Sequence, residues 1–267
     1  MLTTDDYMAL PPGRPDLRAP YGDHPDQFGE LYLPPGAGPH PPVVLVHGGC
    51  WRAQYGLAPL GPLCEALRAA GYAVWSLEYR RIGGGGGWPA TFADVAAGAD
   101  ALHGLAAPLD LGRVVAAGHS AGGQLALWLA ARPRLPRASA LWAADPLPIR
   151  GVLALAALAD LAAAAGRALC GTAVPELLGG SPAERPERYA EASPAALLPL
   201  GLPHVHLVGA ADPIVPPDYL AAFVAAARAA GDDASLTVLP AAGHFEVVAP
   251  APPAWDELLA ALRGLGA

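Results

Sequence analysis

Residues 114–122, VVAAGHSAG, decide how this chain folds and where its chemistry lies. The apolar run 114–117 predicts a buried strand, and residues 124–129, QLALWL, continue at helical spacing. Between them, the pattern G-x-S-x-G predicts a nucleophile elbow, a sharp strand-to-helix turn with Ser120 at its tip. Small residues are needed at Gly118 and Gly122 because the backbone passes close to itself in such a turn. The positive end of the following helix would face any negative charge that develops beside Ser120.

Strands and helices alternate along the chain on both sides of this turn. Short apolar runs predict strands at residues 27–33, 43–46, 72–77, 113–117, 151–158, 204–208 and 235–239. Runs with helical spacing predict helices at residues 60–70, 91–105, 217–230 and 254–262. This alternation is typical of the α/β class, with a mostly parallel central sheet flanked by helices on both faces.

Two segments depart from the alternation. Residues 1–26 are rich in Pro, Asp and Gly, and we expect an irregular lead-in there. Residues 159–202 hold alanine-rich helical sequence, a GGSP turn at 179–182 and a charged patch at 184–191. We expect this stretch to be a cap insertion of helix and loop over the carboxyl edge of the sheet, without a core of its own. Residues 1–267 are therefore predicted to form one domain.

The residues downstream of Ser120 offer the partners that a serine nucleophile needs. The serine requires a base, and the base requires a carboxylate that fixes its tautomer. At a nucleophile elbow the order along the chain is Ser, then Asp or Glu, then His. Asp212 follows the strand at 204–208 and His244 follows the strand at 235–239, so both lie where the sites of α/β sheets collect. We predict a catalytic triad of Ser120, Asp212 and His244.

Four other acids compete with Asp212 for the role of triad acid. They lie in the predicted insertion, in a helix or in a turn before a strand, and they are Asp160, Asp218, Asp232 and Asp233. None of them follows a strand in the way that Asp212 does, so we expect them to fit the role less well.

Backbone donors for an oxyanion are expected from two places. Residues 47–50, HGGC, follow the strand at 43–46 and supply a flexible backbone. The N–H groups of Gly49 and Cys50, together with that of Ala121, are predicted to stabilise a tetrahedral oxyanion. The Cys50 side chain itself is expected to be a small buried thiol and not a nucleophile, because Ser120 is better equipped.

Three aromatic side chains fall near the predicted site loops. Trp51, Trp88 and Phe245 are interpreted either as the lining of an acyl or aryl pocket or as ordinary core. We predict that these three residues bind substrate.

The charge and hydropathy of the chain exclude two classes of partner. The net charge of −8 argues against nucleic acid, since phosphate binding needs a clustered basic face. The apolar run 152–165 is too short to span a bilayer and is interrupted by Asp160, so no membrane partner is expected. Residues 1–10 do not show a secretory signal pattern.

The cysteines do not predict a disulfide framework, and the histidines do not predict a metal site. The three cysteines are odd in number and widely spaced, which favours a reducing, cytoplasmic location. His204 and His206 alternate within a strand without Cys or acids at ligand spacing, so no metal is expected.

Together these motifs resemble the α/β-hydrolase superfamily. The resemblance extends from about residue 27 to the C-terminus and rests on HGGCW at 47–51, YR at 79–80, GHSAG at 118–122, DPIVP at 212–216 and GHF at 243–245. Within the superfamily the chain is similar to hormone-sensitive-lipase-type and feruloyl-esterase-like carboxylesterases and to arylformamidases (kynurenine formamidases). The HGGxW pattern is closer to the formamidases, whereas the esterases more often carry a third glycine where Cys50 stands.

This resemblance implies a carboxylesterase that cleaves a small-molecule ester through an acyl-enzyme and needs no cofactor. Two alternatives use the same triad, an arylformamidase that hydrolyses an N-formylkynurenine-type amide and a small peptidase. A remote alternative is a ligand-binding homologue without catalysis. The oligomeric state is not indicated by the sequence.

Overall fold

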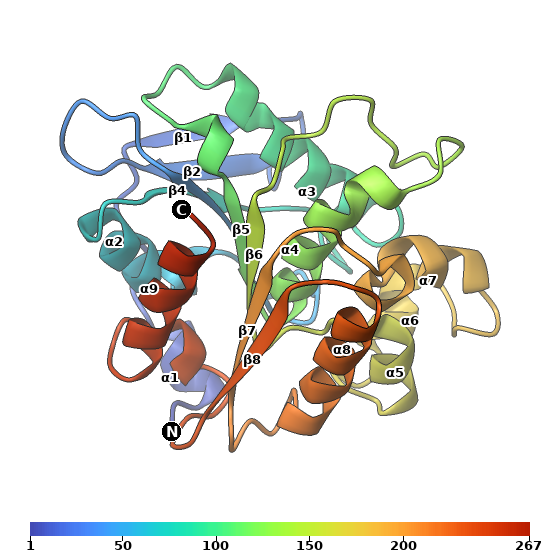
Figure 1. Ribbon diagram of the computed structural model, residues 1–267. Helices are drawn as coiled ribbons and strands as arrows, with labels where there is room; N and C mark the ends of the chain where they lie inside the picture. Colours follow the sequence, from blue (N-terminus) through green and yellow to red (C-terminus); the bar gives the residue numbers. More distant parts are fainter.

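Eight strands form one sheet through the centre of the protein, in the order β1-β2-β4-β3-β5-β6-β7-β8 (Figure 1). Their bounds are β1 Leu17–Pro20, β2 Phe28–Tyr32, β3 Pro42–Val46, β4 Ala73–Leu77, β5 Val115–His119, β6 Gly151–Leu155, β7 His204–Gly209 and β8 Ala234–Leu239. The pairs β1–β2 and β2–β4 are antiparallel and all other pairs are parallel. This computed structural model, which describes residues 1–267, confirms the predicted mostly parallel sheet.

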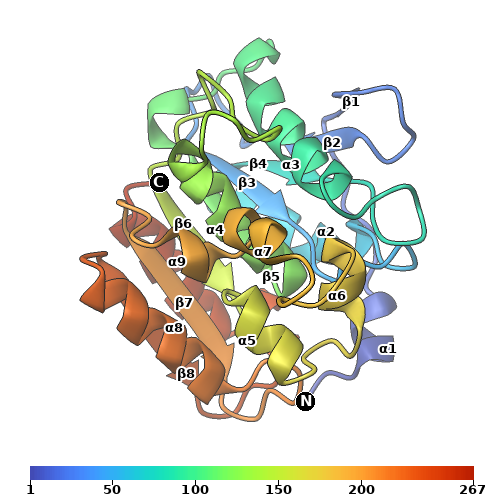
Figure 2. The same ribbon diagram turned by 90° about the vertical axis from the view of Figure 1, so that its right-hand side faces the viewer.

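Helices cover both faces of the sheet (Figures 1 and 2). One face carries α2 (Gly61–Ala69) and α9 (Ala254–Gly264), and the other carries α3 (Ala90–Asp100), α4 (Ala121–Ala131) and α8 (Pro217–Ala229). Because both faces are covered, every residue of β3, β4, β5 and β6 is buried, and these strands consist mainly of Val, Leu and Ala. None of the helices combines the length and the apolar character needed to cross a bilayer.

The lead-in at residues 1–26 is irregular only in part, which refines the expectation from its composition. It contains a short helix, α1 (Thr4–Met8), and the edge strand β1. A capping box begins α1, since the Thr3 side chain accepts a hydrogen bond from the Asp6 N–H while the Asp6 carboxylate accepts one from the Thr3 N–H. The Pro and Gly residues that suggested a loop lie mainly between these two elements and the next strand.

The segment 159–202 holds three short helices, α5 (Leu161–Gly166), α6 (Ala173–Leu178) and α7 (Pro186–Ala192). They lie on the α4 and α8 side of the sheet (Figure 2). Two side chains of α4 anchor the segment, because Gln124 donates to the Ala192 carbonyl and Trp128 donates to the Glu191 carbonyl, each at 2.9 Å. The insertion therefore packs on the helix that begins at Ser120.

Two histidines are buried inside β7. His204 Nδ1 and His206 Nε2 are 2.8 Å apart, and His204 Nε2 lies 3.5 Å from an oxygen of Asp232. The other ring nitrogen of His206 is buried without a hydrogen-bond partner. Burial lowers the pKa of His206 well below its ordinary value, and the neighbouring His204 lowers it further. Burial also lowers the pKa of His204, although the neighbouring Asp232 raises it in part. The neutral form of both rings is therefore favoured in the folded protein, most strongly for His206.

We predict that the free energy of unfolding falls as the pH drops below about 6.5. Below this pH the histidines bind protons in the unfolded chain but stay neutral in the folded chain. Each such histidine therefore lowers the free energy of unfolding by up to about 1.4 kcal/mol per pH unit in that window. Urea denaturation between about pH 8 and pH 5 measures this slope. His206→Gln should reduce the slope, whereas His103→Gln, at an exposed position, should leave it unchanged. Equal slopes for wild type and His206→Gln would contradict the assignment.

Candidate active site

Ser120 lies between β5 and α4 in a strained turn. Its φ of 54° and ψ of −119° are unusual for a residue with a side chain. The turn is tight enough that a Cβ on Gly118 would lie 2.2 Å from the Gly122 carbonyl oxygen, and a Cβ on Gly122 would lie 2.1 Å from that of Val46. Only glycine fits at either position, for the reason expected from the sequence. The Ser120 side chain does not cap α4, so its hydroxyl remains available to the pocket beside it.

Asp212 and His244 meet at the same edge of the sheet. Asp212 follows β7 and His244 follows β8, and Asp212 Oδ2 lies 2.7 Å from His244 Nδ1. The other Asp212 oxygen accepts hydrogen bonds from the N–H groups of Ile214 and Val215, each at 2.8 Å. These bonds fix the carboxylate, and the carboxylate directs the remaining ring nitrogen of His244, Nε2, away from itself.

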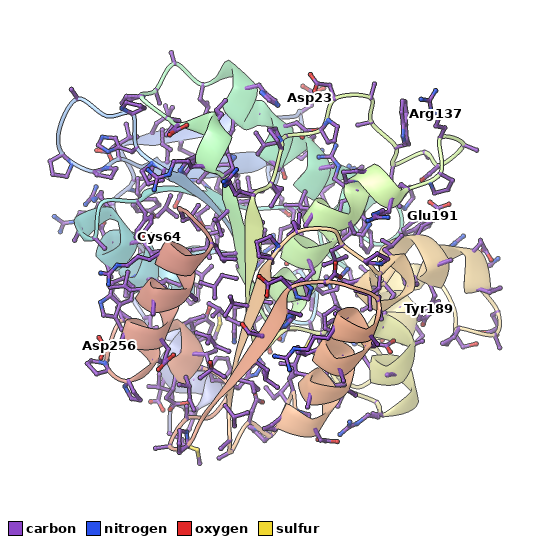
Figure 3. All side chains as sticks on the ribbon, viewed as in Figure 1. Asp23, Cys64, Arg137, Tyr189, Glu191 and Asp256 are labelled. Atoms are coloured by element: carbon purple, nitrogen blue, oxygen red, sulfur yellow. A yellow bond between two sulfur atoms is a disulfide. The ribbon has the colours of Figure 1, made fainter.

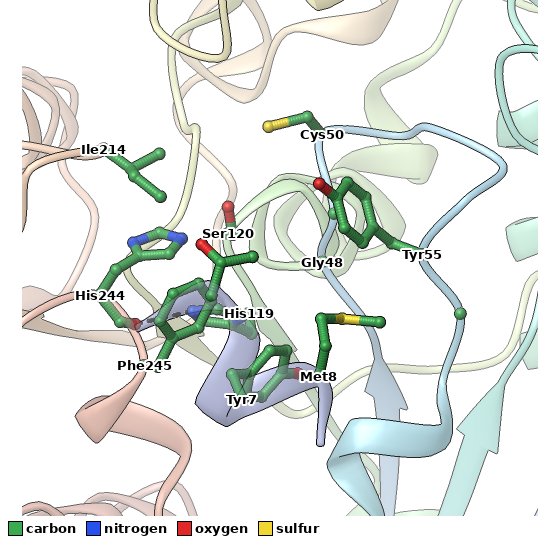
Figure 4. Close-up of a pocket in the computed structure, with 13 residues that line it drawn as sticks. Tyr7, Met8, Gly48, Cys50, Tyr55, His119, Ser120, Ile214, His244 and Phe245 are labelled. Atoms are coloured by element: carbon green, nitrogen blue, oxygen red, sulfur yellow. Dashed lines mark hydrogen bonds between the residues drawn. The ribbon is translucent and has the colours of Figure 1, made fainter. Parts of the chain in front are cut away.

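The side chains of Ser120 and His244 line one pocket (Figure 4). No hydrogen bond joins Ser120 Oγ to His244 Nε2 in this structure. Such bonds are often long in a free enzyme and tighten when substrate binds. A rotation of the Ser120 side chain about its Cα–Cβ bond changes this distance without moving the backbone.

The competing acids are engaged elsewhere. Asp160 caps α5 through the Ala163 N–H, and Asp218 pairs with Arg167 at the surface. Asp232 accepts hydrogen bonds from the N–H groups that begin the loop before β7, and Asp233 is exposed. Among these five acids, Asp212 alone contacts His244.

The backbone donors expected for an oxyanion lie around Ser120. The loop after β3 turns sharply, with φ values of 108° at Gly49 and 49° at Cys50. No hydrogen bond within the protein uses the N–H groups of Gly49, Cys50 or Ala121. Because β3 and β5 are neighbours in the sheet, Gly49, Cys50 and Ser120 line the same pocket, and Ala121 directly follows Ser120. The arrangement can stabilise negative charge on a substrate oxygen.

A network of buried charged side chains holds the start of the HGGC loop in place. His47 donates through Nε2 to Glu78 Oε1 at 2.8 Å, and Arg81 Nη1 lies 3.0 Å from the same oxygen. Tyr79 donates its hydroxyl to the His47 carbonyl at 2.8 Å, and the two rings stack at 4.4 Å. Burial raises the pKa of Glu78, but the charges of His47 and Arg81 outweigh it and hold that pKa below its ordinary value. Glu78 is therefore an anion that fixes the start of the HGGC loop.

Cys50 forms a disulfide with Cys170, which corrects the prediction of a free buried thiol. The bond joins the loop after β3 to the turn between α5 and α6, across 120 residues of sequence. Cys64 on α2 (Figure 3) is the free cysteine, and burial raises its pKa to about 12. Disulfides persist mainly in oxidising compartments, so the cytoplasmic location stays a prediction that this bond weighs against.

Only one of the three predicted pocket aromatics lines the pocket. Phe245 lies in its wall, beside His244. Trp51 is fully buried and donates its ring N–H to Gln124 at 3.2 Å, so its side chain belongs to the core. Trp88 packs edge-on against Phe92 at 5.3 Å, away from Ser120. Trp51 and Trp88 do not line this pocket, which favours the alternative that both are ordinary core residues.

The sequence interpretation missed several pocket residues. They come from α1, from the loop after β3, from the elbow and from the loop after β7, and they are Thr4, Tyr7, Met8, Tyr55, Gly56, Gly48, His119 and Ile214. The capping-box pattern of Thr3 and Asp6 is the signal that could have revealed α1. Residues of the 159–202 insertion do not line this pocket, and Cys170 reaches it only through its bond to Cys50.

His119 is a further polar residue that the site contains. Its Nε2 donates to the His244 carbonyl at 2.9 Å, and the two rings lie 4.6 Å apart (Figure 4). Burial lowers the pKa of His119 well below its ordinary value, and the nearby His244 lowers it further. A neutral His119 therefore holds the loop that carries His244 against the elbow.

Comparisons with known proteins agree with this architecture. A family model described as BD-FAE matches residues 30–226. No curated protein matches the sequence. The native structure of a thermophilic esterase from the planctomycete Thermogutta terrifontis is 22% identical, with a TM-score of 0.74, and the match covers 96% of this chain and 94% of that one.

Two carbohydrate-related structures are also similar. A truncated carbohydrate esterase from gut microbiota is 18% identical, with a TM-score of 0.79, over 93% of this chain and 94% of that chain. A bifunctional GH43-CE protein from Bacteroides eggerthii is 22% identical, with a TM-score of 0.77, over 93% of this chain. The chain spans only 37% of that bifunctional protein. These similarities confirm the predicted α/β-hydrolase fold.

We predict that breaking the Cys50–Cys170 bond lowers the free energy of unfolding by roughly 2–5 kcal/mol, because the bond restricts a long loop in the unfolded chain. Urea denaturation of wild type and Cys170→Ser measures the change. Dithiothreitol should lower the midpoint of the wild type and leave that of Cys170→Ser unchanged. Thiol titration of the unfolded, unreduced wild type should find Cys64 alone, and a count of all three cysteines would contradict the disulfide.

Proposed function

The chain belongs to the BD-FAE family, and on that premise we propose that it is a serine carboxylesterase that acts through an acyl-enzyme on Ser120. One observation carries the proposal. Ser120, held in a strained turn, shares a pocket with His244, whose Nδ1 is 2.7 Å from the fixed carboxylate of Asp212. The esterase activities named for the similar structures support the same reaction class.

The first half of the proposed reaction transfers the acyl group to the protein. His244 Nε2 takes the proton of the Ser120 hydroxyl while Oγ attacks the ester carbonyl carbon. The carbonyl oxygen becomes an oxyanion and accepts hydrogen bonds from the N–H groups of Gly49, Cys50 and Ala121. His244 then gives its proton to the leaving alcohol oxygen as the carbon–oxygen bond breaks. Asp212 stabilises the imidazolium ion that exists between these two steps.

The second half releases the acid. A water molecule takes the place of the departed alcohol, and His244 removes its proton as it attacks the acyl carbon. The same backbone donors stabilise the second oxyanion. Its collapse breaks the bond to Ser120 Oγ, which recovers its proton from His244. All proton transfers are thus assigned to residues of this chain, and the proposal uses no cofactor.

Amide-like substrates would use the same groups, so the identity of the scissile bond is tested with three substrates. p-Nitrophenyl acetate reports an ester, N-formylkynurenine a formamide, and a peptide p-nitroanilide a peptide-like bond. The proposal expects the ester to be turned over with the highest kcat/KM. A preference for N-formylkynurenine would favour the arylformamidase alternative, and turnover of none of the three would favour a non-catalytic protein.

We predict that Ser120→Ala reduces kcat for p-nitrophenyl acetate by at least about 10⁴-fold, because no other nucleophile replaces the hydroxyl. The fold should persist, since alanine occupies the same backbone geometry with a smaller side chain. Ser235→Ala, on β8 and away from the pocket, is the matched control and should retain activity. Near-wild-type activity of a pure Ser120→Ala protein would refute the assignment of the nucleophile.

We predict that Asp212→Asn lowers kcat by about 10⁴-fold, because an amide at this position favours the wrong tautomer of His244. Steady-state kinetics on the same ester measure the loss. Asp218→Asn is the control, since it removes a carboxylate that pairs with Arg167 at the surface and should change kcat little. A loss of only a few fold for Asp212→Asn would show that another group orients His244.

A further inference from the structure

Helix α1 forms one wall of the pocket beside Ser120. Tyr7 and Met8 line the pocket together with Phe245, which follows His244 (Figure 4). The rings of Tyr7 and Phe245 stack, with centroids 4.7 Å apart and planes 16° apart. Thr4 of the same helix adds one hydroxyl to this mainly apolar wall, which comes from a segment more than a hundred residues away from the elbow in the sequence.

The wall is fixed at both ends of α1. Before the helix, the Leu2 N–H donates to one oxygen of Glu246, and the other oxygen accepts from the Gly243 N–H at 2.8 Å. One carboxylate therefore ties the segment before α1 to the loop that carries His244. After the helix, the Arg14 N–H donates to Glu65 of α2 at 2.8 Å. These contacts hold α1 across the pocket and define the space that remains.

The geometry of the reaction assigns a direction to each substituent of the acyl carbon beside Ser120. The acyl carbon of a tetrahedral intermediate bonds to Ser120 Oγ, to the oxyanion, to the leaving oxygen and to the acyl chain. The oxyanion must face the Gly49 and Cys50 N–H groups, and the leaving oxygen must face His244 Nε2, which protonates it. In Figure 4 Cys50 and His244 lie on opposite sides of Ser120, and Tyr7 and Met8 lie on a third side. The acyl chain is therefore directed toward Tyr7 and Met8.

The pocket that these residues share is small and open on one side. The cavity beside Ser120 has a volume of about 90 Å³. A protein cavity of about 150 Å³ holds one benzene molecule, and a water molecule occupies about 30 Å³ of liquid. The pocket is therefore clearly smaller than a cavity that holds one aromatic ring.

We propose that Tyr7 and Met8 determine the length of the acyl group and restrict this protein to esters of short aliphatic acids, of acetyl to butyryl size. The inference rests on the proposed esterase function and adds the substrate class. Met8 is the sharper of the two positions for a test, because its side chain is 37% exposed and its replacement leaves the core intact. Tyr7 is buried, so its removal also affects packing.

The test compares kcat/KM for p-nitrophenyl acetate, butyrate and octanoate in wild type, Met8→Ala and Met8→Trp. The wild type should prefer acetate or butyrate over octanoate by at least about tenfold, in the range that a few methylene groups contribute in an apolar pocket. Met8→Ala should raise the octanoate-to-acetate ratio at least about tenfold. Met8→Trp should lower the butyrate-to-acetate ratio. Asp5→Ala, on the same helix but outside the pocket, is the control and should change neither ratio.

The outcomes separate the two claims. If the wild type cleaves none of the esters, the proposed function fails and the inference fails with it. If the wild type cleaves octanoate as well as acetate, or if the folded Met8 variants keep the wild-type ratios, only the inference is overturned. Thermal denaturation of each variant establishes that it is folded.

Discussion

The backbone contact around Ser120 is the constraint on which the rest of the site depends. Gly118, Gly122 and Val46 approach so closely that a single added carbon at either glycine would meet a carbonyl oxygen at 2.1–2.2 Å. This packing holds Ser120 at a positive φ, a conformation that costs on the order of 1–3 kcal/mol and persists only where the surroundings enforce it. The same contact packs the start of α4 against the end of β3. The Ala121 N–H therefore lies close to the HGGC loop.

Carboxylates then fix the loops that the sheet brings to this edge. Asp212 uses one oxygen for two backbone N–H groups and the other for His244, and Glu78 joins the imidazole of His47 to Arg81. Glu246 links the segment before α1 to the His244 loop. Each loop is therefore held by charge-assisted hydrogen bonds, and such fixed dipoles stabilise developing charge without reorganising.

Much of this arrangement could be predicted from sequence, because it is encoded locally. The strands are short apolar runs, and the elbow and the order of Ser120, Asp212 and His244 are readable without distances. What the sequence did not disclose depends on tertiary contacts. The Cys50–Cys170 bond joins residues 120 positions apart, and nothing in their spacing marks the pair. The inward turn of Trp51 follows from its hydrogen bond to a helix, and α1 is one turn long, with a capping box as its only signal.

The strained Ser120 hydroxyl is the nucleophile on which the whole proposed reaction depends. An organophosphate that phosphorylates an activated serine tests this claim without any assumption about the natural substrate. The protein is incubated with paraoxon, digested and analysed by mass spectrometry for a diethylphosphoryl adduct. We predict one adduct per chain, on Ser120, with loss of esterase activity in step with its formation. An adduct confined to another residue, or full activity after Ser120 is modified, would contradict the account.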